Sequence, residues 1–176
     1  MMIAARCLRS VLAVAAALSA TEPVPPGMID AGFLQDLDGR SRALREPAWS
    51  GRVLLVSFVA IWSARPGDRP NPNRSQAVFI RSIGSQFASD GLKTLIVGVP
   101  PAGMTHGELR NVGLAWGTDV VEIAVDPQGA VARSHDVDRY PTTLLLDAAD
   151  RVVKRWEGLA PTHELASAIG DQLHVR

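Results

Sequence analysis

The sequence predicts a single α/β domain in which helices flank a mixed β-sheet. Between residues 52 and 125, apolar strand-like runs alternate with amphipathic segments, which is typical of β-α-β units. Two further strand-like runs then follow each other across a short turn, and they predict a closing antiparallel hairpin before a C-terminal helix. With 176 residues, of which 47% are hydrophobic, the chain is long enough to bury one core.

The N-terminal residues differ in composition from this domain. Arg6 and Arg9 precede an apolar stretch, Val11–Ala20, which is followed by a Pro-rich segment. About ten apolar residues are too few for a helix that crosses a hydrocarbon core roughly 30 Å thick. We therefore expect a cleaved secretory signal at 1–20, a spacer at 21–29 and the domain at 30–176. The mature protein would be periplasmic or secreted, without stable membrane insertion; an uncleaved N-terminal tether is the alternative.

The first elements of the domain are expected to be a short hairpin, a buried strand and a helix. The turn Asp36–Gly39 lies between two weakly apolar stretches and predicts a hairpin or strand pair. Residues 52–61 are continuously apolar and rich in branched side chains, which suits the central strand of a sheet covered on both faces. Residues 75–89 then have apolar side chains near helical spacing, which predicts a helix that packs on the sheet. These side chains are Val78, Phe79, Ile83 and Phe87.

The middle of the domain continues the alternation. Residues 92–99 predict a second buried strand, and Thr105 with Glu108 three residues later forms the pattern of a capping box at the start of a second helix. Residues 120–125 predict a third strand. A short helix or turn is expected at 126–137.

The last two strands and a terminal helix complete the predicted sheet. Strand-like residues lie on both sides of the tight turn Asp147–Asp150. Pro161 and Thr162 open the final segment, whose apolar positions share one face of a helix. These positions are Leu165, Ala168, Ile169 and Leu173.

Composition and motif spacing argue against several classes of function. Lys plus Arg equals Asp plus Glu, at 18 each, so nothing drives binding to nucleic acid or to an anionic membrane. No Gly-rich phosphate loop or dinucleotide fingerprint is present, and the histidines lack the spacing of metal ligands. The histidines are His106, His135, His163 and His174. We expect no cofactor and no metal.

Three stretches carry a resemblance to a known family: residues 56–67 (VSFVAIWSARPG), 95–99 (LIVGV) and 139–158 (RYPTTLLLDAADRVVKRWEG). They resemble a thioredoxin-like domain of the TlpA/ResA or AhpC/TSA (redoxin) type, over roughly residues 30–175. The resemblance implies that Pro141 is cis and lies beside the position of the family's CxxC motif. It also implies a peptide-docking groove, formed by Trp62, Ser63, Tyr140, Pro141 and Thr142. The competing interpretation of Pro141 is that it simply turns the chain into the closing hairpin.

The chain departs from this family at the reactive residues. The CxxC positions hold Ser63-Ala64-Arg65-Pro66, and the buried acid of thioredoxin falls at Ser57. Cys7 is the only cysteine, and it lies in the predicted signal. Because disulfide exchange and peroxide reduction both begin with a thiolate, the family's usual chemistry is excluded for the mature chain.

The sequence therefore favours a non-catalytic module of the cell envelope that binds a protein or an extended peptide at the cis-proline groove. The alternatives are a family-type thiol-disulfide oxidoreductase or antioxidant role, through Cys7 if the signal is retained, and a non-redox enzyme that uses Ser63 as a nucleophile with His106 as its base. A weaker candidate is an anion-binding site at Arg65, Arg69 and Arg74, near the predicted start of a helix. The competing interpretation of these arginines is solvated charges in a loop.

Overall fold

A computed structural model describes residues 34–61, 71–116 and 121–174 of the chain. The predicted signal and spacer at 1–29 lie outside the described residues. The strands are β1 (Leu34–Gln35), β2 (Ser41–Arg42), β3 (Leu54–Ala60), β4 (Lys93–Val99), β5 (Glu122–Val125), β6 (Thr142–Leu146) and β7 (Val152–Glu157). The helices are the 3-10 turn η1 (Pro47–Trp49), α1 (Pro72–Phe87), α2 (His106–Trp116), α3 (Ala130–Ser134) and α4 (Thr162–His174).

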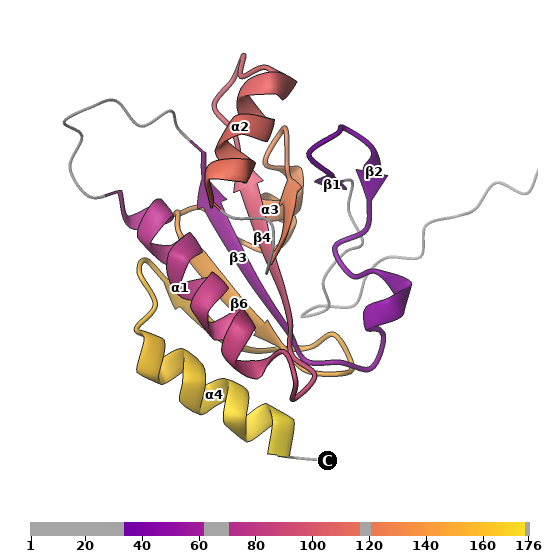
Figure 1. Ribbon diagram of the computed structural model, residues 1–176, viewed down its shortest axis with the longest axis vertical. Coiled ribbons are helices and arrows are strands. Elements are labelled where there is room, and N and C mark those ends of the chain that lie inside the picture. The colour runs from indigo at the N-terminus through magenta and orange to yellow at the C-terminus, as the bar shows by residue number, and fades with distance from the viewer. Residues whose placement is uncertain (1–33, 62–70, 117–120, 175–176) are drawn as a thin grey trace, which may run out of the picture.

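In the described part of the chain, the strands form one mixed sheet with the order β2-β1-β5-β4-β3-β6-β7 (Figure 1). Strands β3, β4 and β5 are parallel, whereas β6 is antiparallel to β3, and β7 is antiparallel to β6. The predicted α/β architecture, with a closing hairpin and a C-terminal helix, is confirmed. The predicted central strand is displaced by one position, because β4 is the middle strand of this order and β3 lies between β4 and β6.

Strand β3 is apolar along its length because both of its faces are covered. Every residue of β3 is buried. Leu55 and Val59 pack with side chains of α1 and α4, which contact each other on one face of the sheet (Figure 1). Phe58 points to the opposite face, where it packs with side chains of α3 and η1. Successive side chains of a strand point to opposite faces of the sheet. Because both faces of β3 are covered, the whole run is apolar and does not alternate with polar residues.

Helix α1 begins earlier than the sequence predicts and buries a different face. Asn71 caps the helix by accepting a hydrogen bond from Asn73 N (2.9 Å). Val78, predicted to face the core, is 54% exposed. The prediction for Val78 is wrong because two polar residues, not apolar ones, continue the buried stripe through the first turns of the helix. The buried residues of α1 are Asn73, Gln76, Ala77, Ile80, Ile83 and Gly84.

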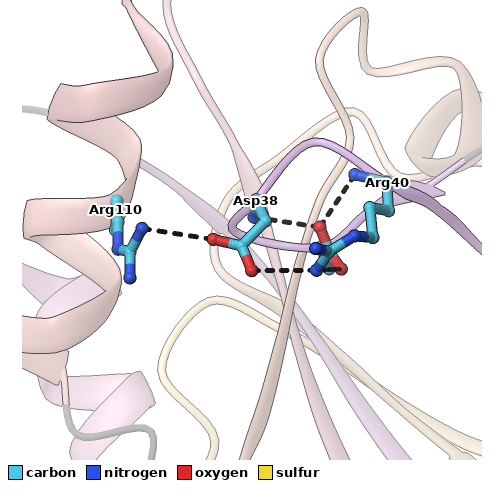
Figure 2. A network of polar contacts seen from close by, with 4 residues as sticks. Asp38, Arg40 and Arg110 are labelled. Atoms are coloured by element: carbon cyan, nitrogen blue, oxygen red, sulfur yellow. Dashed lines mark hydrogen bonds and ion pairs between the residues drawn. The ribbon is translucent and has the colours of Figure 1, made fainter.

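The predicted hairpin at Asp36–Gly39 is confirmed as β1 and β2, and its turn docks on α2. Gly113 leaves room for Leu37, because a Cβ atom at residue 113 would lie 2.7 Å from Leu37 Cδ1. Figure 2 shows the polar side of this contact, in which Asp38 pairs with Arg110 (3.2 Å) and Arg40 (3.0 Å). Exposed ion pairs contribute little to stability, so it is the apolar contact of Leu37 with α2 that keeps the turn docked on this helix.

The turn between β6 and β7 is closed by the buried carboxylate of Asp147. Asp147 Oδ1 accepts hydrogen bonds from Ala149 N (2.8 Å) and Arg151 N (3.0 Å), and Oδ2 accepts from Arg151 Nε (2.7 Å). Burial by itself raises the pKa of the Asp147 carboxyl. The hydrogen bonds from Arg151 and Ala149, with the positive charge of Arg151, outweigh burial and hold this pKa below its ordinary value.

We expect Asp147→Asn to lower the free energy of unfolding by about 1 to 2 kcal/mol near neutral pH, because a neutral amide bonds Arg151 more weakly. A depressed folded-state pKa means that the carboxylate stabilises the fold fully above its unfolded-state pKa of about 4. This contribution is lost as the pH falls through the folded-state value. Urea unfolding should thus show a constant difference between native and variant above about pH 6, which shrinks below about pH 4. A difference unchanged in acid would contradict this account.

The remaining helices match their predicted positions. Thr105 and Glu108 form the predicted capping box of α2, with Glu108 Oε2 accepting from Thr105 N (2.8 Å). In α4, Leu165, Ala168 and Ile169 are buried against the sheet, as predicted. Among the described residues, no helix has the length and apolar character needed to cross a membrane.

Candidate functional site

The sheet brings four chain segments together at the edge where the parallel strands end. Thr142, the first residue of β6, pairs with Phe58 near the carboxyl end of β3 and with Glu157 at the end of β7. The start of α1 meets the same region, because Ala60 N donates a hydrogen bond to Asn73 Oδ1 (3.0 Å). We call residues 139–142 and 158–160 the Pro141 edge.

Hydrogen bonds fix the two segments of the Pro141 edge to each other. The Tyr140–Pro141 peptide bond is cis, which the family resemblance implies. Gly158 N donates a hydrogen bond to Pro141 O (2.7 Å), and Thr142 Oγ1 donates to Arg139 O (2.8 Å). Pro141 and Thr142 are both buried. Their side chains therefore support the loop, and a ligand here would meet mainly backbone groups and Tyr140.

Tyr140 lies half-buried against the face of the sheet that carries α3. Its hydroxyl is close to the start of this helix, because a Cβ atom at Gly129 would lie 3.9 Å from Tyr140 Oη. Burial raises the pKa of the Tyr140 phenol, and the nearby Asp126 carboxylate raises it further, although Arg133 opposes them. Tyr140 therefore presents a neutral, amphipathic side chain next to Pro141.

A buried hydrogen-bond network lies directly behind the Pro141 edge. Ser57 Oγ and Thr143 Oγ1 share a hydrogen bond (3.0 Å), and Gln76 Nε2 donates to Thr143 Oγ1 (3.2 Å). At its other end, Gln76 Oε1 accepts from Ala160 N (2.9 Å). The side chains of Ser57, Gln76 and Thr143 are completely buried. The network thus links β3, α1 and β6 to the segment between β7 and α4.

This network contains no ionisable side chain. Ser57 occupies the position where the resemblance places a buried acid. Its partner Thr143 is neutral, and so is Gln76, which bonds to Thr143. A carboxylate at such a position can take up a proton, whereas these hydroxyl and amide groups remain neutral at accessible pH. What these residues can do is position the backbone, because each polar atom they bury has a hydrogen-bond partner.

Gln76 and Asn73 are the residues that sequence reasoning missed. Gln76 falls within the predicted helix at 75–89 but outside its apolar stripe, and Asn73 falls in the Pro- and Asn-rich stretch before that helix. Their spacing of three residues puts them on the same face of α1 as Ile80 and Ile83, and that spacing is the signal that could have identified them.

Several predicted site residues lie outside the part of the chain that the structure describes. These are Trp62, Ser63, Arg65, Pro66 and Arg69. Arg74 is exposed in the first turn of α1, and α2 begins at His106, whose side chain is not described. The predicted Ser63–His106 pair and the predicted arginine cluster therefore remain predictions.

The remaining histidines do not gather into a metal centre. His135 is buried, with its ring edge-on to Phe58, and His163 is exposed at the start of α4. Within the described ranges, no group of three potential metal-binding side chains occurs.

A surface pocket of about 230 Å³ lies at the opposite end of the sheet from Pro141. It is formed around the β6–β7 turn and the last turn of α4. The charged residues that line it, Asp147 and Arg151, are bonded to each other. Because these charges neutralise each other, the pocket offers no net charge to orient a ligand. Its lining is Gly51, Val53, Asp147, Ala148, Ala149, Arg151 and Gln172.

Solved structures share this arrangement of strands and helices. A putative thiol:disulfide interchange protein DsbE from Chlorobium tepidum matches with a TM-score of 0.68 and 20% identity, over 83% of this chain and 95% of that chain. The fold is thioredoxin-like. The exposed lipoprotein thioredoxin of Streptococcus pneumoniae matches this thioredoxin-like chain with a TM-score of 0.63 and 18% identity, over 80% of this chain and 98% of its own.

A secreted disulfide oxidoreductase of Mycobacterium tuberculosis also has the thioredoxin-like fold, with a TM-score of 0.61 and 11% identity, over 80% of this chain and 96% of its own. No protein-family model matches the sequence, and no curated protein matches it significantly. The likeness to these oxidoreductases is therefore a likeness of fold.

Proposed function

We propose that this chain is an exported, non-catalytic thioredoxin-like protein that binds an extended peptide or a protein segment at the Pro141 edge. The observation that carries the proposal is the cysteine count: Cys7 is the only cysteine in 176 residues. A CxxC motif is therefore impossible at any position. The fold is that of disulfide oxidoreductases, but the two thiols that their chemistry requires are missing.

Export is supported by the N-terminal sequence and by the nature of the structural neighbours. Arg6 and Arg9 followed by Val11–Ala20 have the order of a secretory signal. Two of the structural neighbours are described as exposed or secreted proteins. A signal peptidase cut near Ala20 would also remove Cys7 and leave a mature chain without thiols.

The Pro141 edge suits an extended peptide because its backbone is held in a fixed position by hydrogen bonds. An extended peptide that crosses this end of the sheet would bond to the main chain of the loops there, while side chains beside it provide selectivity. Leu159 lies next to Gly158, which bonds Pro141 O, and it is 46% exposed. An apolar side chain of the partner would contact Leu159 there.

We expect Leu159→Ser to weaken peptide binding about tenfold without changing the melting temperature, because this side chain is already largely in water. The probe is the tightest linear peptide selected from a displayed random library against the full-length chain, measured by calorimetry. The matched control is Val153→Ser, since Val153 is also an exposed apolar residue of the hairpin (42%) but lies toward the far end of β7. Equal affinity of the Leu159→Ser variant and the native chain would argue against the proposal.

A further inference from the structure

We infer that Gln76 is a positioning residue, which holds the segment Gly158–Ala160 at the distance from Pro141 that peptide binding requires. The inference rests on the proposed function and names the contact that prepares the site. Gln76 lies on α1, yet its amide reaches two other parts of the fold. It donates to Thr143 on β6 (3.2 Å) and accepts from Ala160 N (2.9 Å).

Complete burial shows that Gln76 is committed to these contacts. A buried amide is costly unless both its ends are hydrogen-bonded, and an apolar side chain would fill the same space without that cost. Both polar ends of Gln76 have partners, and one of them is a backbone N–H in the link between β7 and α4. The side chain therefore does more than pack, because it fixes the position of that link.

The two ends of the amide act on backbone of different rigidity. Thr143 lies inside β6, where pairing with Ser57 on β3 and Trp156 on β7 holds its main chain in place. Ala160 lies between β7 and α4, outside the sheet ladders. In this link, Gly158 N bonds Pro141 O, and Leu159 is exposed. Loss of the Ala160 bond would therefore loosen the second segment of the Pro141 edge, whereas loss of the Thr143 bond would not.

This asymmetry can be tested with two variants of the full-length chain. Gln76→Met keeps the length of the side chain and removes both bonds, while Thr143→Val keeps the shape of the residue and removes only the bonds to its hydroxyl. We expect both to lower the melting temperature. Only Gln76→Met should weaken the selected peptide, by about tenfold or more, and only this variant should show faster amide hydrogen exchange at Gly158.

A third variant, Gln76→Glu, provides the rescue. Glutamate retains an acceptor for Ala160 N, so its peptide affinity should stay within a few-fold of native even though its stability falls. If Gln76→Met does not fold, Gln76→Glu and Thr143→Val still test the inference, because both keep the Ala160 contact and both should bind. Weakened binding in either of them would overturn the inference.

The remaining outcomes separate this inference from the proposed function. If affinity falls in parallel with stability in all three variants, Gln76 is only a structural residue and the positioning role is wrong. If Leu159→Ser still weakens the peptide in that case, the binding function stands. If no selected peptide depends on Leu159, the proposed function fails and the inference fails with it.

Discussion

The full-length chain is expected to leave the rate at which dithiothreitol reduces insulin disulfides unchanged. Reduction of insulin by a thioredoxin requires a thiolate that attacks the disulfide and a second thiol that resolves the mixed disulfide. The chain carries one cysteine, Cys7, so the second thiol is missing whether or not residues 1–20 are retained. An active thioredoxin run beside it should raise the rate many-fold, and this protein should not.

The control for this experiment is Cys7→Ser, which removes the last thiol. Native and Cys7→Ser proteins should give the same turbidity curve as dithiothreitol alone. Acceleration by the native chain but not by Cys7→Ser would show redox chemistry through that cysteine. Acceleration by both would mean that the chain acts through a group other than a thiol, and the non-catalytic proposal would be wrong.

Gly98→Ala is expected to destabilise the fold by about 2 to 3 kcal/mol, although it adds a single methyl group. Gly98 lies in β4, where an added Cβ atom would stand 2.1 Å from Cδ1 and 2.8 Å from Cγ1 of Ile61. Ile61 is only 2% exposed and packs against Leu109 and Val125, so it has little space to move.

A double-mutant cycle checks whether the collision with Ile61 is the cause. Ile61→Val removes Cδ1, the atom closest to the added methyl, so the double variant should be less destabilised than the sum of the two single variants. Gly170→Ala is the matched control, because an added Cβ at this position in α4 meets nothing within 4 Å. It should be neutral or raise stability by about 0.5 to 1 kcal/mol through helix propensity. Additive losses in urea unfolding would refute the steric explanation.

Most of the architecture could be predicted from the sequence because it follows from local patterns. The continuous apolar runs at 52–61 and 92–99 indicated strands covered on both faces. In the structure, the strands β3 and β4 of these runs are buried as predicted. The capping box at Thr105 located the start of α2, because its two hydrogen bonds depend on residues three positions apart. Turn residues likewise located the β6–β7 hairpin.

The inner face of α1 and the network behind Pro141 were not predictable in the same way. Hydropathy selects apolar residues, so it favoured Val78 and passed over Gln76, although the buried stripe of the helix includes Gln76. The hydroxyl pair of Ser57 and Thr143 depends on the register between β3 and β6, which are separated by a long stretch of chain. Polar residues become core residues only when tertiary contacts supply their partners, and those contacts leave no periodic signal.

The charged side chains of strand β7 affect whether copies of this protein can associate with one another. In the described part of the chain, β7 ends the sheet, and one side of its backbone faces no further strand. Lys154 and Glu157 on this strand are exposed, and Arg155 donates hydrogen bonds to the carbonyl oxygens of His135 and Asp136. Charged side chains along an edge strand oppose edge-to-edge pairing. Self-association into extended sheets through β7 is thereby disfavoured.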